Sequence, residues 1–357
     1  MKPLMAVVTI LVLAAAGAPA PSVAQSSPAG PTGQGAAAPR TTLDIYFIDV
    51  EGGQSTLIAT PAGQTLLIDA GFARPDNRDT ERIRAAARAA GISRLDYLLV
   101  THFHGDHLGG VPEIARRLPV KTFVDNGDLV ETEAFAADPF AAYKPVRERG
   151  QQLHPAPGDR LPLQGVEVDV VSAGGVLLKK ALPGAGQANP ACATLRPVRS
   201  DSVENERSLG IRLKFGRFTF LDLGDLSGNK LAALACPNNL VGHADVYLVP
   251  HHGNEDSSIP AVVAAVSPRV AILNNGVMKG GDADAFASLR GARGVEDTWQ
   301  LHKTRRSDAQ NFPDAFIANL NLDDGEKDLG AWIKVSADAG GSFTVTNGRT
   351  GVTKSYK

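Results

Sequence analysis

The sequence is poor in cysteine, has no excess of basic charge and contains a single long hydrophobic run. Only Cys192 and Cys236 are cysteines among its 357 residues, which excludes a disulfide-rich scaffold and any zinc module built on four cysteines. The 36 Lys and Arg residues face 38 Asp and Glu residues, so we expect no extended nucleic-acid surface. With 43% hydrophobic and 21% charged residues, the composition is that of a globular protein and excludes disordered or collagen-like chains.

The hydrophobic run lies at the N-terminus and predicts export. Lys2, the apolar run 5–16 and the small residues of Ser22-Val23-Ala24 are typical of a signal peptide over residues 1–24. The run is shorter than the roughly 20 apolar residues of a membrane-spanning helix, so we expect no transmembrane segment after cleavage and a secreted or periplasmic protein. A retained signal anchor is the alternative. Residues 25–40, rich in Ser, Pro, Gly and Ala, are predicted to be a flexible leader.

Residues 41–357 are predicted to form one layered α/β domain, because apolar strand-like runs alternate with amphipathic helices. Asp79 is the expected N-cap of the first helix. The expected strands are 43–50, 55–59, 65–69, 95–100, 166–171, 209–215, 218–223, 246–249 and 270–273, and the expected helices are 79–90 and 131–152, the second one interrupted at Pro139 and Pro145.

A metal-binding motif follows the expected strand 95–100. It places His102, His104, Asp106 and His107 within six residues of each other in the sequence Thr101-His-Phe-His-Gly-Asp-His107. Imidazoles two residues apart in an extended segment project to the same side, and Gly105 allows the chain to turn back. One short loop can therefore provide ligands for two ions.

Two later strands also end in residues that bind metals. Asp225 follows the strand 218–223, where its two oxygens could bridge two cations, although an Asp that caps a turn is an equal alternative. His251 and His252 follow the strand 246–249. Because adjacent side chains of an extended segment diverge, we expect one of the two to bind metal and the other to contact substrate or a supporting carboxylate. Five of the eight histidines lie in these two loops, which favours a metal site.

The order of these motifs resembles the metallo-β-lactamase superfamily. The residues that carry the resemblance are Asp69-Ala-Gly71, His102 to His107, Gly224-Asp225 and His251-His-Gly253. Within the superfamily, the segments Asp49-Val-Glu-Gly-Gly-Gln-Ser55 and Asn205-Glu-Arg-Ser-Leu209 are similar to ComEC-type competence proteins and phosphorylcholine esterase relatives. The resemblance implies a four-layer αββα sandwich with metals in the cleft between its sheets.

The resemblance also implies a dinuclear site, with two Zn²⁺ ions or alternatively Mn²⁺. The implied ligands are His102 and His104 for the first ion, Asp106 and His107 for the second ion, Asp225 as a bridge, and His252 or, failing that, His251 to close the second site. The superfamily has a third imidazole in the first site, but the one histidine between His107 and Asp225 is His154, which we expect to be a surface residue. Asn205 stands in that region and could face the metal or the substrate. Because an amide is a weak zinc ligand, occupancy of the first site is left open.

The implied reaction is hydrolysis by a metal-bridged hydroxide. Asp106 is expected to be both a ligand and a proton acceptor, and His302 a catalytic residue at the leaving group, with a solvated strand end as the alternative for His302. Asp69 is expected to orient the metal-binding loop through hydrogen bonds, with a turn-forming Asp as the alternative. Arg305 and Arg306 are candidate phosphate contacts.

The expected substrate is a small-molecule or envelope phosphodiester. Lactones, thioesters and β-lactams are alternatives on the same fold, and a non-catalytic binding protein with a degraded metal site is a further alternative. The sequence does not predict the oligomeric state. In an oxidising compartment Cys192 and Cys236 are predicted to form a disulfide, with free buried cysteines as the alternative.

Overall fold

The computed structural model describes residues 40–200, 202–321 and 330–357. The predicted signal peptide and nearly all of the predicted leader lie outside these residues. Within them, no helix combines the length and the apolar character that crossing a membrane requires.

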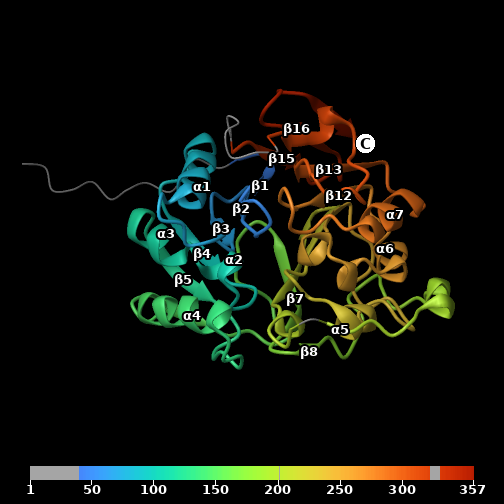
Figure 1. Ribbon diagram of the computed structural model, residues 1–357, viewed down its shortest axis with the longest axis horizontal. Helices are drawn as coiled ribbons and strands as arrows, with labels where there is room; N and C mark the ends of the chain where they lie inside the picture. Colours follow the sequence, from blue (N-terminus) through green and yellow to red (C-terminus); the bar gives the residue numbers. More distant parts are fainter. Residues whose placement is uncertain (1–39, 201, 322–329) are drawn as a thin grey trace, which may run out of the picture. The chain divides into compact units, whose positions relative to one another are not determined.

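The described chain is built around two sheets (Figure 1). The nine-stranded sheet has the order β17-β16-β15-β1-β2-β3-β4-β5-β6, and the eight-stranded sheet has the order β14-β13-β12-β11-β10-β9-β7-β8. The strands of the first sheet are β1 (Leu43–Ile48), β2 (Thr56–Ala59), β3 (Thr65–Ile68), β4 (Leu95–Leu99), β5 (Val120–Val124), β6 (Gln151–Leu153), β15 (Trp332–Ala337), β16 (Phe343–Asn347) and β17 (Thr353–Tyr356). Those of the second are β7 (Glu167–Ala173), β8 (Val176–Leu177), β9 (Gly210–Phe215), β10 (Phe218–Asp222), β11 (Val246–Leu248), β12 (Val270–Leu273), β13 (Asp297–His302) and β14 (Ile317–Asn319).

Helices cover the outer faces of both sheets. In Figure 1 the blue-green helices α1, α3 and α4 lie on one side of the strands and the yellow-orange helices α5, α6 and α7 on the other. The α-helices are α1 (Arg78–Ala89), α2 (Gly105–Leu108), α3 (Val111–Arg117), α4 (Ala134–Arg147), α5 (Gly228–Ala233), α6 (Pro260–Val266) and α7 (Ala283–Gly291). Short 3₁₀ helices are η1 (Pro190–Thr194), η2 (Asn205–Arg207), η3 (Pro250–Gly253), η4 (Glu255–Ser257) and η5 (Asp314–Phe316).

The alternation of side chains along β1 explains the layering. Ile45 and Phe47 belong to the core between the sheets, where the Phe47 ring lies 5.6 Å from that of Phe220 on β10. Tyr46 and Ile48, one residue out of step, belong to the core under the helices. Because both faces of β1 are buried, its sequence is a nearly continuous apolar run. This arrangement confirms the predicted four-layer αββα sandwich.

The expected strands are all present, but two details of the helices differ from the prediction. The N-cap position of the first helix, α1, is Asn77, whose side chain makes no capping hydrogen bond, and not Asp79, whose Oδ2 accepts a hydrogen bond from the Phe72 amide at 2.9 Å. The second helix, α4, continues through Pro139 and Pro145 without interruption.

Tertiary contacts outweigh the two prolines of α4. The buried Tyr143 donates a hydrogen bond to Asp125 Oδ2 at 2.6 Å, and Arg147 pairs with the same carboxylate at 2.9 Å. Each proline removes one backbone hydrogen bond, and the buried contacts of the helix compensate for this loss. The chain then enters β6, which the sequence analysis assigned to the helix.

The sequence analysis also missed β15 to β17, which add three strands at the C-terminal end of the chain. β15 pairs with β1 in antiparallel register, from Leu43 opposite Ala337 to Ile48 opposite Trp332. The burial of β15 and β16 alternates residue by residue. That period of two was the available signal.

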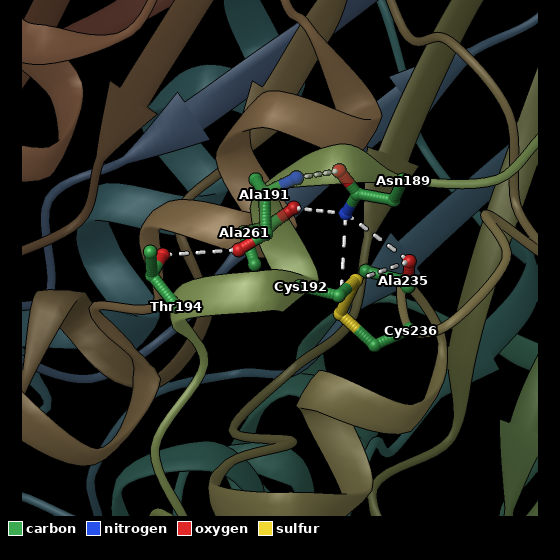
Figure 2. Close-up of a disulfide and its surroundings, with 7 residues drawn as sticks. All are labelled: Asn189, Ala191, Cys192, Thr194, Ala235, Cys236 and Ala261. Atoms are coloured by element: carbon green, nitrogen blue, oxygen red, sulfur yellow. Dashed lines mark hydrogen bonds between the residues drawn. A yellow bond between two sulfur atoms is a disulfide. The ribbon is translucent and has the colours of Figure 1, made fainter.

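The predicted disulfide between Cys192 and Cys236 is present (Figure 2). It fixes η1 next to the end of α5. The side chain of Asn189 adds three hydrogen bonds. Its Nδ2 donates to the carbonyl oxygens of Ala261 at 2.8 Å and Ala235 at 3.2 Å, and its Oδ1 accepts from the backbone amide of Ala191. The loop around η1 is therefore tied to both α5 and α6.

Candidate metal centre

The centre forms where three strands end. The loop 102–107 follows β4 of the nine-stranded sheet, whereas Asp225 follows β10 and the pair His251-His252 follows β11 of the eight-stranded sheet. A hydrogen bond from the His251 amide to the Gly224 carbonyl at 3.1 Å joins the last two loops. The sandwich thus brings together residues that are more than a hundred positions apart in the sequence.

Four of the predicted ligands converge in what we call the second-site cluster, namely Asp106, His107, Asp225 and His252. One ligand atom from each lies within 4.8 Å of the others, and all four residues are buried. Asp225 Oδ2 is the hub, since it lies 3.0 Å from His107 Nε2 and 3.2 Å from His252 Nε2. Asp106 Oδ2 lies 3.2 Å from His252 Nε2.

The donor set of this cluster fits a divalent cation. Among the described residues, the buried atoms with no hydrogen-bond partner include His102 Nε2, His107 Nε2, Asp106 Oδ1 and Asp225 Oδ1. Buried polar atoms are normally paired, and leaving one unpaired costs about 1–3 kcal/mol. A cation bound by imidazole nitrogens and carboxylate oxygens would satisfy these atoms, and such ligands suit zinc and manganese.

His102 and His104, the predicted ligands of the first ion, and Asn205, which was expected to face the metal or the substrate, form what we call the first-site group. His102 Nε2 lies 3.9 Å from Asp225 Oδ2, and the rings of His102 and His104 are 4.6 Å apart. His104 Nε2 lies 3.0 Å from Glu131 Oε2 and 3.3 Å from Ser202 Oγ, which leaves Nδ1 as the ring atom for an ion. This group flanks the hub but does not belong to the cluster around it.

The two adjacent histidines have different environments. His252 lies in the second-site cluster. His251 Nδ1 is held by Asp256 Oδ1 at 2.7 Å, while its Nε2 lies 3.3 Å from Asn205 Nδ2 and 3.8 Å from Asp225 Oδ2. His251 therefore faces the first-site group.

Strained backbone sets these directions. His251 and His252 have φ values of 49° and 56°, in the left-handed region of backbone conformation that residues other than glycine rarely adopt. Asp69 is also left-handed, with a φ of 58°. Such residues cost on the order of 1–3 kcal/mol each, and they gather at functional sites.

Carboxylates orient three of the histidines. Asp69 Oδ2 lies 2.7 Å from His107 Nδ1, and Asp69 is itself fixed by the amide and hydroxyl of Thr101 at 2.8 and 2.7 Å. Glu131 and Asp256 hold His104 and His251 in the same way. Carboxylate–histidine pairs of this kind typically orient metal-binding imidazoles. Asp69 thus has the position that was expected of it.

The electrostatics of the centre reflect this crowding of charges. Burial alone would lower the pKa of His107, but Asp225, Asp106 and Asp69 outweigh burial and raise it well above its ordinary value. Burial would likewise raise the pKa of Asp225, but His107 and the neighbouring histidines hold it well below its ordinary value. The cluster therefore keeps anionic carboxylates in a buried place, as cation binding requires.

Lys279 is a residue of the centre that the sequence analysis missed. It follows β12, and its ammonium pairs with Asp106 Oδ2 while lying 5.6 Å from the centre of the Phe72 ring. Its stem packs on Gly52, where a Cβ would come within 2.8 Å of Lys279 Cβ. No motif marks this lysine in the sequence, because it lies in a loop whose path depends on the tertiary fold.

The other sequence candidates are not members of the second-site cluster. His302 is buried at the end of β13, with Nε2 3.8 Å from Asp49 Oδ2. Arg306 is held by Asp282 and Asp308 at 2.8 and 2.9 Å. His154 is a surface residue beside Asp125, as expected. The catalytic role of His302 and the phosphate-binding roles of Arg305 and Arg306 stay predictions without support from the geometry.

Comparison with known protein families finds a match that includes the metal-binding loop 102–107. The profile of the "Metallo-beta-lactamase superfamily" matches residues 48–186, which include the loop 102–107. Residues 48–186 are therefore similar to the metallo-β-lactamase superfamily, and the two layered sheets are consistent with the sandwich of that superfamily.

Two of the similar proteins are competence proteins, as the sequence motifs predicted. "Competence protein ComA" of Neisseria gonorrhoeae is 24% identical over 241 residues, which cover 67% of this chain and 28% of that protein. "ComE operon protein 3" of Bacillus subtilis is 24% identical over 249 residues, which cover 65% and 28%. A "UPF0173 metal-dependent hydrolase" of Thermodesulfovibrio yellowstonii is 37% identical over 70 residues, which cover 20% and 24%. The chain thus matches about a quarter of the length of each relative.

Among solved structures, the metallo-β-lactamase fold protein YhfI from Bacillus subtilis is similar with a TM-score of 0.46 and 11% sequence identity, and the match covers 73% of this chain and 96% of that one.

Proposed function

We propose that the protein is an exported, metal-dependent hydrolase that acts on phosphodiesters and uses two ions, most simply Zn²⁺. The observation that carries the substrate class is the position of Lys279, whose ammonium reaches the carboxylate of Asp106 in the second-site cluster. A cationic side chain at a cation-binding centre favours an anionic substrate over a neutral lactone or thioester.

The neighbouring cations pair with carboxylates that are not candidate metal ligands, whereas the partner of Lys279 is one. Arg78 pairs with Glu51 and Asp79 at 2.7 Å, and Arg82 pairs with Glu51 at 3.1 Å. The Lys279 side chain is 38% exposed, so its ammonium faces solvent as well as the centre. A metal bound by Asp106 would take over that carboxylate and leave the ammonium available to a substrate.

The residues of the chain have separate tasks in this proposal. A bound divalent cation supplies Lewis acidity and lowers the pKa of a bound water, which is the chemistry that hydrolysis needs. Asp106, His107, Asp225 and His252 hold the second ion, and Asp225 also faces His102 of the first-site group. Asp69 and Glu131 fix the orientation of His107 and His104. Lys279 binds the anionic oxygen of the substrate.

The test compares Lys279→Met with Lys303→Met, a lysine that pairs with Asp314 at 3.0 Å. Both variants and the wild type are assayed, metal-loaded, on bis-p-nitrophenyl phosphate and on the neutral ester p-nitrophenyl acetate. Because a hydrogen bond to a charged group contributes about 1.5–3 kcal/mol, we expect Lys279→Met to lower the ratio of diester to ester kcat/KM roughly 10- to 100-fold. The Lys303→Met variant should keep the wild-type ratio.

Two results would contradict the proposal. Equal losses on both substrates would assign Lys279 to the stability of the centre and not to substrate binding. Turnover of neutral esters without any diester cleavage by the wild type would favour the lactone or thioester alternative. Export is tested separately, by N-terminal mass spectrometry of protein recovered from a periplasmic fraction.

A further inference from the structure

Large apolar side chains are exposed at six positions of the described chain: Val130, Phe135, Val176, Val203, Met278 and Val352, with exposed fractions of 42 to 60%. A scattered exposed apolar residue is ordinary. Four of these six, however, border the metal centre, and this concentration is what calls for an explanation.

Three of the four lie in segments that contact His104. The Phe135 ring lies 5.2 Å from the His104 ring. Val130 precedes Glu131 and Val203 follows Ser202, and both Glu131 and Ser202 contact His104 Nε2. The segments of the two valines are joined, because Glu204, next to Val203, accepts a hydrogen bond from the Val130 amide at 3.2 Å.

The fourth, Met278, lies on the side of the second-site cluster. It precedes Lys279, whose ammonium contacts Asp106 and faces the ring of Phe72. We call Val130, Phe135, Val203 and Met278 the apolar rim. The rim therefore has members in segments that contact the first-site group and in the segment that carries Lys279.

We propose that the substrate is an amphiphilic phosphodiester whose alkyl chain lies on the apolar rim while its phosphate is bound at the metal centre and by Lys279. This inference rests on the proposed function and narrows its substrate class. Charge complementarity selects this occupant. An alkyl chain alone would leave Lys279 without a counter-ion once Asp106 binds metal, and a small polar diester would leave four apolar side chains in water.

The experiment compares two soluble substrates that differ only in chain length, methyl and octyl p-nitrophenyl phosphate, below the micelle concentration of the octyl ester. Each methylene that leaves water strengthens binding about threefold, so partial burial of the chain should raise the octyl-to-methyl ratio of kcat/KM by at least roughly 30-fold in the metal-loaded wild type. The triple variant Val130→Ser, Phe135→Ser, Val203→Ser should lower this ratio at least about 10-fold. Val352→Ser, which changes an exposed apolar residue outside the rim, should keep it.

A second readout does not depend on turnover. Calorimetric binding of octyl phosphate and methyl phosphate to the same proteins should show the same preference for the octyl compound and the same loss in the triple variant. Circular dichroism and metal content confirm that the triple variant is folded and loaded.

The two proposals fail in different ways. Tight, rim-dependent binding of octyl phosphate without cleavage of any diester would overturn the phosphodiesterase function and keep the rim as an alkyl-binding surface. An octyl-to-methyl ratio near one, in both turnover and binding, would overturn the rim proposal. If light scattering then showed a wild-type dimer that the triple variant converts to monomers, the rim would be an interface between copies of this chain.

Discussion

The second-site cluster and the first-site group share the loop 102–107, yet their ligands have converged to different degrees. In the cluster, atoms of four residues already lie within 4.8 Å of one another. In the first-site group, His102 Nε2 is 3.9 Å from the shared Asp225, and His104 is directed by Glu131 and Ser202. The comparison shows that the fold brings the candidate ligands of one site closer together than those of the other.

The difference follows from what supports each site. Backbone hydrogen bonds lock the second-site loops, including the Ala70 amide to the His107 carbonyl at 2.7 Å and the Gln54 amide to the Asp106 carbonyl at 3.2 Å. The first-site group depends on side chains from the segments around Glu131 and Ser202, which lie between regular elements. Preorganised ligands bind more tightly because less conformational freedom is lost on binding. We therefore expect the second site to fill first.

Replacing Asp225, the hub that both sites share, should remove the difference between the two sites, because neither should then hold its ion. Four imidazoles have Nε2 within 3.9 Å of Asp225 Oδ2, namely those of His102, His107, His251 and His252. Asp225→Ala removes the carboxylate on which both sites depend, so we expect it to bind less than one ion per chain and to lose at least about 1000-fold in kcat. Elemental analysis after dialysis and the diester assay measure both effects.

Asp308→Asn is the control for this variant, since Asp308 is an exposed carboxylate that pairs with Arg306. It should keep the wild-type metal content and activity. If Asp225→Ala still bound two ions, the hub role would be wrong and the two sites would be independent of each other.

The parts of the centre that were predictable are those that follow strand ends in short segments. The candidate ligands His102, Asp106 and Asp225 could be proposed from the sequence because apolar strands precede them and the chain turns directly after. The separate directions of His251 and His252 were not predictable, because their left-handed backbone is imposed by the surrounding fold. Lys279 and Glu131 were missed for a related reason, since each contacts the centre from a loop far away in sequence.

The fold was predictable where apolar runs alternated with amphipathic helices. The apolar runs of β1 to β4, β7 and β9 to β12 predicted the layered α/β domain, whereas the alternating β15 and β16 were not recognised. The path of α4 through Pro139 and Pro145 could not be inferred, because it depends on contacts of Tyr143 and Arg147 with Asp125 in another element. Local propensity was overridden by tertiary packing.

Replacing His251 should increase the difference between the two sites, because it should weaken ion binding at the first site alone. The sequence lacks the third imidazole of the first site, and His251 is oriented towards that site by Asp256 and lies 3.8 Å from the shared carboxylate. We expect His251→Ala to reduce the affinity for the more weakly bound ion about 100-fold while the tightly bound ion keeps its affinity. Competition titration with a chromophoric chelator resolves the two affinities.

Asn205→Ala is the matched variant, because Asn205 occupies the same side of the centre, 3.3 Å from His251. An amide is a poorer zinc ligand than an imidazole, so its effect on the weaker ion should be roughly tenfold or less. A larger effect from Asn205→Ala than from His251→Ala would make Asn205 the ligand of the first site. An equal loss of both ions in His251→Ala would show that the two sites fold as one unit.

The smallest expected effect concerns a buried carboxyl next to the second-site cluster. Asp222 accepts hydrogen bonds from Gln54 at 3.1 and 3.2 Å and from the Gly224 amide at 3.0 Å. Burial, with a smaller contribution from the charge of Asp69, raises its pKa to about 7, although its hydrogen bonds and the nearby His107 oppose this. The folded protein therefore holds a proton on Asp222 where the unfolded chain, with a pKa near 3.8, does not.

The sign of the pH dependence follows from this difference. A raised carboxyl pKa in the folded state stabilises the protein at low pH, and this contribution is lost as the pH rises from about 4 to about 7. For the metal-free protein, we expect Asp222→Asn to remove roughly 2 kcal/mol of the fall in unfolding free energy between about pH 5.5 and about pH 8, as measured by urea denaturation. Asp308→Asn, which changes an exposed carboxylate, should leave the fall as in the wild type. A pH dependence of the unfolding free energy that is unchanged in Asp222→Asn would mean that Asp222 is ionised in the folded state. The region next to the second-site cluster would then hold one more negative charge than a protonated Asp222 gives it.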